Sequence, residues 1–345
     1  MKSLSSSGRE ELSLSALIQA CYPYFSTQFP IPKKHQATGK PSLLDCILAG
    51  LAVFHLKFSS LLQYDQQCRK ITGSNLKTLY RVQNPPCDTT LRERLDELSP
   101  KSLRGIFKIL FAFAQRGKIL ESYLFWNQHY LLSVDGSGHH TSSKVFCDNC
   151  CVKQLESGQK IYYHPVLCGV LVHPHQKQVI PLAPEAVQKS EILAKNDCEQ
   201  RAAERLLRDF RREHPNLKAV VTEDGLYAAG KHLELLQELD LKFIIIAKPG
   251  NLRLLYDWIE SSLLTGVVRC HAGVTQRYRF LNQVPLNDTF FERKVNFLEY
   301  DEINAQGKKQ HFAWITDLPL SESTLETVMR GAERVGGLKT KRLTR

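Results

Sequence analysis

The sequence lacks an apolar run long enough to cross a membrane. Its most apolar uncharged stretch, Cys46–Phe54, falls far short of the ~20 residues that a spanning helix needs. The first residues carry two acids before any apolar stretch and show no small-residue cleavage site, so they do not read as a secretory signal. Internal repeats and low-complexity tracts are also missing. We therefore expect a soluble cytoplasmic protein with no membrane partner.

Cysteine spacing of the kind that supports a disulfide framework is missing too. The chain has 10 cysteines among 345 residues, and they are irregularly spaced. In a chain of this size without an export signal, this usage indicates reduced thiols, with at most one metal knuckle.

Acidic residues are too few to balance the basic ones. The chain has 46 lysines and arginines against 35 acids, a net charge of +11. This excess fits a polyanionic partner, although basic charge alone also fits simple solubility. Residues 1–125 hold 17 basic and 9 acidic residues, residues 126–329 hold 23 and 25, and residues 330–345 hold 6 and 1. The positive charge therefore belongs to the two ends of the chain.

The chain is long enough to form two or more hydrophobic cores, and it shows three successive patterns of apolar residues. Residues 1–125 show helical periodicity, as in Leu43–Leu62 and Leu103–Phe113, and a turn at Pro85 and Pro86 leads to an N-cap near Asp88. This pattern predicts an all-helical domain.

Residues 126–250 alternate strands with helices and predict an α/β sheet of mixed order. The expected strands are Tyr130–Val134, Val166–Val172, Val179–Pro181, Ala219–Thr222 and Phe243–Ala247, with helices at Asp197–Arg212 and Lys231–Leu239. From Val267 to Leu318 the alternation is of period two, and no helix separates the expected strands. This pattern predicts a β-meander of Val267–His271, Gln276–Val284, Lys294–Tyr300 and His311–Thr316.

Two Asp-Gly pairs come after apolar strands. Asp135 closes the strand Tyr130–Val134, and Asp224 follows Ala219–Thr222 with one residue between. Carboxylates at strand ends of one α/β sheet lie where such sheets bind ligands, and two of them are suitable oxygen ligands for Mg²⁺. The alternative is that each Asp-Gly pair simply forms a turn.

Several segments resemble bacterial insertion-sequence transposases of the DDE type, over roughly residues 40 to 330. They are LKFSSLLQYD, NLKTLYRV, PCDTTLRERLD, LLSVDGSG, HPVLCGVLVHPHQKQVIPLAPE, KNDCEQRAAERLLRDFRREHP and VVTEDGLYAAG. The resemblance implies an RNase H-like fold with a β-rich insertion at residues 251–318. It also implies that Asp135 and Asp224 are the first two metal-binding acids, with two Mg²⁺ ions in the intact enzyme.

The third acid of that family is a glutamate in a stretch resembling W-x-I-E-N-E-T-F-N-T-L-K, and this chain has no such stretch. Residues 319–345 predict the start of a final helix, Ser323–Arg334, followed by VGGLKTKRLTR. Glu326 and Glu333 are the fallback third acids, and the alternative is that they are solvated helix charges.

A change of reading frame would explain the missing motif. Permitted codons for Val335–Thr344, read from the last base of the first codon, spell W-R-I-E-N-E-T-F-N-T. We hypothesise that the frame shifted upstream of Val335, by accident or programmed slippage, so that the basic tail is out of frame. Gene codons that do not yield this motif in the other frame would exclude the hypothesis.

Cys147 and Cys150 form the C-x₂-C half of a zinc knuckle, with no second half at standard spacing. A structural Zn²⁺ would need two further ligands, and free or buried thiols are the alternative. The nearby candidates are His139, His140, Cys151, His164 and Cys168. Asp197 and Glu199 read as N-cap and first-turn charges of a helix rather than as metal ligands.

The helical domain is the expected DNA-binding part because it holds most of the charge excess. Its candidate residues are Arg69, Lys70, Lys77, Arg81, Arg92 and Arg94, with Lys248 as a possible phosphate contact elsewhere. Ordinary solvated helix faces are the alternative.

These features together favour a DNA transposase that binds the ends of its own element as a homodimer on double-stranded DNA, near the bacterial nucleoid. It would cleave and join strands with two metal ions, and loss of the third acid would impair this chain. Two alternatives stay open. One is a metal-dependent nuclease on the same fold, and the other is a non-catalytic DNA-binding remnant.

Overall fold

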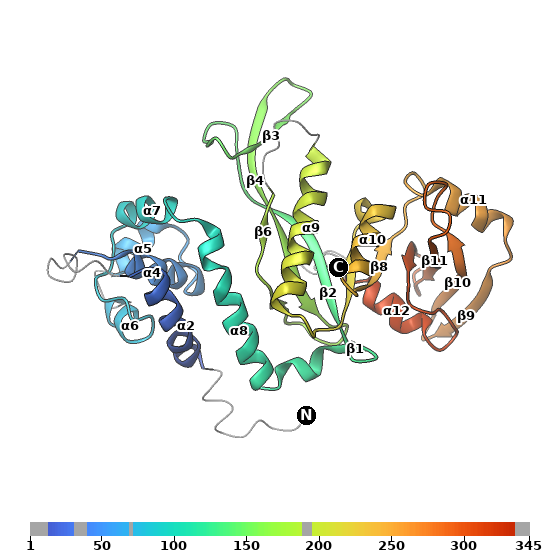
Figure 1. Ribbon diagram of the computed structural model, residues 1–345, viewed down its shortest axis with the longest axis horizontal. Helices are drawn as coiled ribbons and strands as arrows, with labels where there is room; N and C mark the ends of the chain where they lie inside the picture. The colour runs from blue at the N-terminus through green and yellow to red at the C-terminus, as the bar shows by residue number, and fades with distance from the viewer. Residues whose placement is uncertain (1–12, 31–39, 69–71, 188–194, 335–345) are drawn as a thin grey trace. The chain divides into compact units, whose positions relative to one another are not determined.

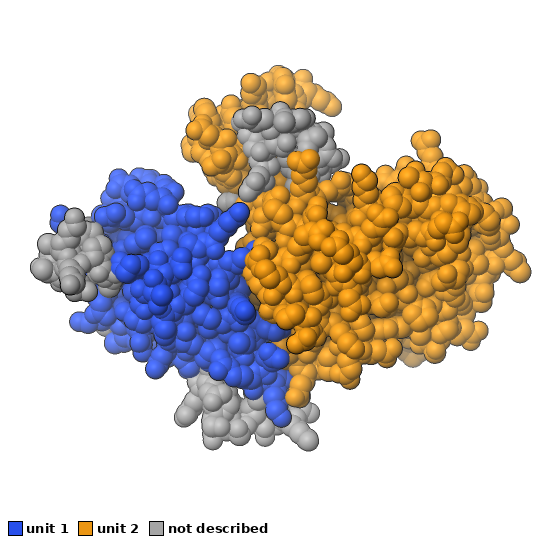
Figure 2. Space-filling model, viewed as in Figure 1, with its two compact units in different colours: residues 1–119 blue, residues 120–345 orange. Residues whose placement is uncertain are grey.

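A computed structural model describes residues 13–30, 40–68, 72–187 and 195–334 of the chain. The chain divides into two compact units, residues 1–119 and residues 120–345 (Figure 2). No helix in these ranges is both long enough and apolar enough to cross a membrane.

The described part of the first unit is helical (Figure 1). Its helices are α2 (Leu14–Gln28), α4 (Leu43–His55), α5 (Leu61–Cys68), α6 (Thr72–Thr78), α7 (Asp88–Asp96), η1 (Pro100–Leu103) and α8 (Arg104–Arg116). Buried side chains of α2 and α4 form its core, together with Tyr64, Leu76 and Leu91. Ser42 and the buried Asp45 cap the start of α4 reciprocally, which satisfies two backbone amides at that end.

Two local expectations for this unit need correction. The apolar periodicity predicts one helix over Leu43–Leu62, but α4 ends at His55 and α5 begins at Leu61. Lys57 adopts a left-handed backbone conformation (φ 57°), which stops a right-handed helix. The N-cap of α7 is Cys87 rather than Asp88.

The second unit holds a mixed sheet of twelve strands in its described residues. The strands before residue 250 are β1 (Leu124–Trp126), β2 (His129–Ser142), β3 (Cys151–Gln154), β4 (Lys160–Val172), β5 (Ile180–Pro181), β6 (Glu185–Ala186), β7 (Ala219–Glu223) and β8 (Lys242–Ile246). The main strand order is β3-β4-β2-β7-β8-β12-β11-β10-β9. Strand β2 is antiparallel to β4 and parallel to β7, and β7 is parallel to β8.

The meander strands are found close to their expected positions, as β9 (Thr265–His271), β10 (Val274–Pro285), β11 (Lys294–Ile303) and β12 (Lys309–Thr316). They do not form a separate sheet, because β12 pairs antiparallel with β8 and joins the meander to the rest. Helix α11 (Arg253–Ser261) precedes them, and sequence reasoning missed it.

Helices cover both faces of this sheet, as sheets with parallel strands require. Helix α9 (Lys195–Glu213) packs on the face of Leu132, since a Cβ at Gly169 would meet both Leu206 and Leu132. Helix α12 (Leu325–Ala332) packs on the other face, where Leu131 and Val220 share a core with Val328 and Met329.

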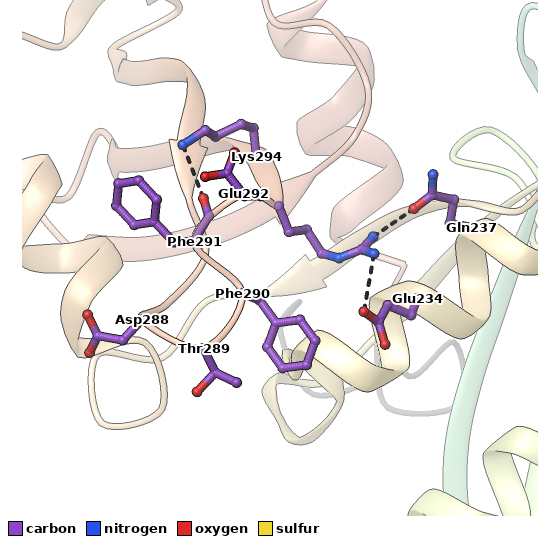
Figure 3. A pocket seen from close by; sticks show the side chains of 9 residues that line it. Glu234, Gln237, Asp288, Thr289, Phe290, Phe291, Glu292 and Lys294 are labelled. Carbon is purple, nitrogen blue, oxygen red and sulfur yellow. Dashed lines mark hydrogen bonds and ion pairs between the residues drawn. The ribbon is translucent and has the colours of Figure 1, made fainter.

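The loop between β10 and β11 docks on helix α10 (Gly230–Glu238), as Figure 3 shows. The Arg293 guanidinium donates to Gln237 Oε1 (2.9 Å) and lies 3.7 Å from Glu234 Oε1. Phe290 lies so close to Gly230 that a Cβ there would come within 2.1 Å of its ring. The pocket drawn in Figure 3 lies between this loop and α10, and neither Asp135 nor Asp224 lines it.

Candidate functional site

Asp135 and Asp224 come at the same offset after the last paired residues of two neighbouring parallel strands. The last register pair between β2 and β7 joins Ser133 to Thr222, and each aspartate follows two residues later. The backbone at Asp224 is extended (φ −71°, ψ 164°). Residues two apart on a strand share a face, and equal positions on neighbouring strands lie about 5 Å apart. By this register, the two carboxylates leave the sheet on the same face.

The expected strand end at Asp135 is wrong in one respect. Strand β2 does not stop at Val134 but continues to Ser142, because β4 pairs with it along that whole length. What stops at Ser133 is the pairing with β7. Asp135 thus lies within strand β2, just beyond the residues that pair with β7. Asp224 directly follows β7.

The C-terminal end of α12 reaches the same face. The Ser133 hydroxyl donates to the carbonyl oxygen of Arg334 (3.0 Å), and the Arg334 guanidinium donates to the carbonyl oxygen of Pro174 (2.6 Å). Ser133 precedes Asp135 by two residues on the same side of β2. The last described residue of the chain is therefore anchored next to the two aspartates.

Lys248 is the basic partner of Asp224. Its Nζ lies 2.8 Å from Asp224 Oδ1, which also accepts the backbone N–H of Gly225 (2.6 Å). Both side chains are about half exposed. A Cβ at Gly225 would lie 2.9 Å from Lys248 Cδ and 3.0 Å from the carbonyl oxygen of Ile246. A glycine at this position therefore lets the lysine lie over the carboxylate.

Sequence reasoning missed the contact that Glu199 makes with Tyr227 on the opposite face. Its Oε1 accepts the hydroxyl of Tyr227 (3.1 Å), and a Cβ at Gly136 would come within 3.1 Å of the same oxygen. Burial, followed by the charges of Glu199 and Glu223, raises the pKa of Tyr227, so its hydroxyl stays protonated as a donor. The long-range packing of α9 on β2 creates this contact, and helix periodicity carries no signal of it. The side chain of Asp197 lies outside the described residues.

A buried carboxylate adjoins the site. Glu223 is fully buried directly before Asp224, and its Oε2 lies 2.7 Å from Nε2 of His232 on α10. Its second oxygen has no hydrogen-bond partner within the described residues. Successive strand residues point to opposite faces, so this pair lies across the sheet from Asp224.

The fallback third acids face the meander. Glu326 pairs with Arg269 on β9 (3.0 Å) and with Arg330 on its own helix (2.6 Å). Burial and the charge of Glu302 on β11 raise the pKa of Glu333. The predicted out-of-frame tail, residues 335–345, lies outside the described residues.

The candidate DNA-binding residues of the first unit differ in exposure. Lys77 on α6 and both Arg92 and Arg94 on α7 are exposed. Arg81 is half-buried, with its guanidinium carbon 5.4 Å from the ring centre of Tyr22. Arg69 and Lys70 lie outside the described residues.

The structure also brings three of the predicted zinc candidates together, namely Cys147, Cys150 and His164. Cys151 instead contacts the carbonyl oxygen of Val187, and Cys168 pairs with Asp135 on β2. Burial and the neighbouring Asp135 raise the pKa of Cys168. The side chain of His139 is not among those described.

Comparisons with known proteins leave the family open. The chain matches no protein-family model and no curated protein. Among solved structures it is similar to the NurA nuclease from Sulfolobus solfataricus, with 11% identity over 68% of this chain and 86% of that chain, at a TM-score of 0.29. A pre-cleavage Mos1 transpososome gives 12% identity over 53% of this chain and 57% of that chain, at a TM-score of 0.14. From these two similarities we infer neither fold nor function.

Proposed function

We propose that this chain derives from a metal-dependent DNA transposase of the DDE type, with Asp135 and Asp224 as its first two catalytic acids. The observation that carries the proposal is their equal register on neighbouring parallel strands. An Asp-Gly turn needs no such partner, whereas a shared metal site needs two carboxylates on one face.

The topology around these strands supports an RNase H-like catalytic core. Strands β4 and β2 are antiparallel, β2, β7 and β8 are parallel, and α9 forms the connection that leads into β7. In this order Asp135 on β2 and Asp224 just after β7 belong to the centre of the sheet, and the carboxyl ends of parallel strands are where α/β sheets bind ligands.

The donor set fits Mg²⁺. Two carboxylates with room for water and phosphate oxygens are what Mg²⁺ prefers. When bound between Asp135 and Asp224, two such ions would activate a water or 3′-hydroxyl and stabilise the leaving oxygen.

Lys248 would exchange partners when DNA binds. In the structure it offsets the charge of Asp224 at 2.8 Å. A cation that binds the same carboxylate competes with it, which frees the ammonium group for a nearby phosphate. Lys248 would thus pair with the Asp224 carboxylate in the free protein and with a DNA phosphate in the complex.

The end of α12 indicates where a third acid would lie. In the other reading frame, the motif glutamate comes four or five residues after Arg334. A helix continued that far would advance about 6–7 Å, which matches the ~7 Å along β2 from Ser133 to Asp135. If the last helix continued along β2 in a frame-restored chain, its glutamate would lie near the two aspartates.

The first unit would bind the DNA, since phosphate contacts supply most of the affinity of such proteins. Lys77, Arg92 and Arg94 are the exposed basic residues available for it. Assembly as a homodimer on the inverted repeats at the two element ends completes the proposal, and target DNA is its second substrate.

The test compares the 345-residue chain with a frame-restored chain on plasmids that carry the element ends or scrambled ends. We expect Mg²⁺-dependent nicking and strand joining at the true ends by the restored chain, and little activity with retained end binding by this one. Cleavage without joining would favour the nuclease alternative. Binding without cleavage by both chains would favour the DNA-binding remnant. Nicking by the 345-residue chain at the restored chain's rate would instead indicate Glu326 or Glu333 as the working third acid.

A further inference from the structure

We propose that Cys147, Cys150, His164 and His140 form a structural Zn²⁺ site at the far end of the β2–β4 hairpin. In the structure, the ligand atoms of Cys147, Cys150 and His164 all lie within 4.8 Å of one another. Within the described residues, no other group of three or more such side chains is as closely spaced. The site is independent of the proposed catalytic function.

The three ligand atoms are spaced as a tetrahedral zinc ion requires. The two sulfur atoms lie 3.8 Å apart, and Nε2 of His164 lies 3.3 Å from Cys147 Sγ and 3.2 Å from Cys150 Sγ. Zn–S and Zn–N bonds of about 2.3 and 2.0 Å at tetrahedral angles give S···S and S···N separations of about 3.8 and 3.5 Å. A disulfide needs sulfur atoms about 2.05 Å apart, so this pair is not one.

The backbone builds this cluster locally. The Cys150 amide donates to the carbonyl oxygen of Cys147 (3.1 Å), which closes a four-residue turn and directs both sulfur atoms to one side. The Cys147 amide donates to Cys150 Sγ (3.3 Å). Phe146 stacks on Tyr162 of β4 at 4.4 Å between ring centres, which fixes the turn beside His164.

His140 supplies the fourth ligand. It is paired with His164 across β2 and β4, and the two ring centres lie 6.1 Å apart. Two imidazoles on one zinc ion have ring centres about 5 Å apart, so the ring of His140 must move toward that of His164 to bind the ion. Cys168 is four residues along β4 from His164, about 13 Å away, which is too far to contribute.

A metal here would stabilise an exposed loop. The segment between β2 and β3 exposes the apolar side chains of Val145 and Phe146, and Phe146 stacks on Tyr162. A metal that joins β2, this loop and β4 replaces the hydrophobic core that so short a segment cannot form.

The experiment measures zinc in the full 345-residue chain purified without chelator. We expect about one zinc per chain, at least tenfold less in the double variant Cys147→Ser, Cys150→Ser, and an unchanged amount in the control Cys270→Ser, an exposed cysteine on β9. In the parent, Co²⁺ substitution should give the strong visible bands of a tetrahedral site together with thiolate-to-cobalt charge transfer.

Three results would overturn the proposal. They are a metal-free parent that does not take up added Zn²⁺, equal zinc in the double variant, and octahedral cobalt spectra. His140→Gln should weaken zinc binding at least tenfold, and unchanged binding would remove His140 from the ligand set. Limited proteolysis separates metal loss from misfolding, since the double variant should be cut in residues 143–150 while the rest of the chain stays resistant.

Discussion

At the scale of single residues, the proposed site rests on Asp135 and Asp224, and the sequence predicts both as candidates. An acid before glycine after an apolar run is a visible signal. The ion pair of Asp224 with Lys248 and the contact of Glu199 with Tyr227 give no such signal, because both join residues far apart in the sequence. Local patterns therefore predict which side chains could act, but not which neighbours set their charge.

Lys248→Gln should strengthen binding of divalent ions to the free protein. The substitution removes the cation that competes for Asp224, and a half-exposed ion pair of this kind contributes about 0.2–1 kcal/mol. We expect a 1.5- to 5-fold lower Kd for Mn²⁺ in a calorimetric titration. Lys242→Gln is the matched control, because Lys242 pairs with Asp317 in the same way at 3.1 Å. Equal shifts in both variants would show that only the net charge matters.

At the scale of elements, strand positions follow from the sequence and strand partners do not. Period-two alternation predicts the four meander strands to within a few residues, yet it contains nothing to indicate that β12 pairs with β8. The strand ending predicted at Val134 is wrong for the same reason, since β4 keeps β2 extended past Gly136. Long-range pairing decides both cases.

Gly331→Ala should loosen α12 from the sheet. A Cβ at Gly331 would lie 2.4 Å from the ring of Phe125, a clash inside the core of the second unit. Although alanine favours helix, such overpacking costs about 1–3 kcal/mol, so urea unfolding should show that loss and hydrogen exchange should rise in α12. Gly266→Ala is the control, because a Cβ there meets nothing within 4 Å. Equal stability of the two variants would contradict the packing described for α12.

Docking of the end of α12 should weaken in acid through His173. Burial, and then the charges of His175 and Arg334, lower the pKa of His173 below its usual 6.5. The unfolded chain therefore binds this proton more readily, so the stability contribution is present above about pH 6.5 and is lost as the pH falls through the folded pKa.

His173→Gln should remove this part of the acid sensitivity. Between pH 7.5 and 5.5, the free energy of unfolding should fall less in His173→Gln than in the parent. His271→Gln, which changes an exposed histidine on β9, should follow the parent. A variant that loses as much stability as the parent would show that protonation of His173 does not matter.

At the scale of the whole molecule, our proposal assigns DNA binding to the basic residues 1–125 and the chemistry to the second unit. Changing Lys77, Arg92 and Arg94 together to Gln should weaken DNA binding, and it should reduce the slope of log K against log salt by about 2–3. Changing Arg277, Lys308 and Lys309 to Gln removes the same charge from the meander and should have a smaller effect. Equal losses would place the DNA surface on both units.

The most direct test of the account measures cleavage and DNA binding by the frame-restored chain carrying Asp135→Asn or Asp224→Asn. Each substitution removes a metal ligand without removing a phosphate contact. We expect Mg²⁺-dependent nicking at element ends to fall at least about 100-fold in each variant, while end binding stays within a few-fold of the parent. Asp257→Asn, an exposed position on α11, should keep full activity. Nicking near the parent rate in both variants would contradict the assignment of Asp135 and Asp224 as the catalytic pair.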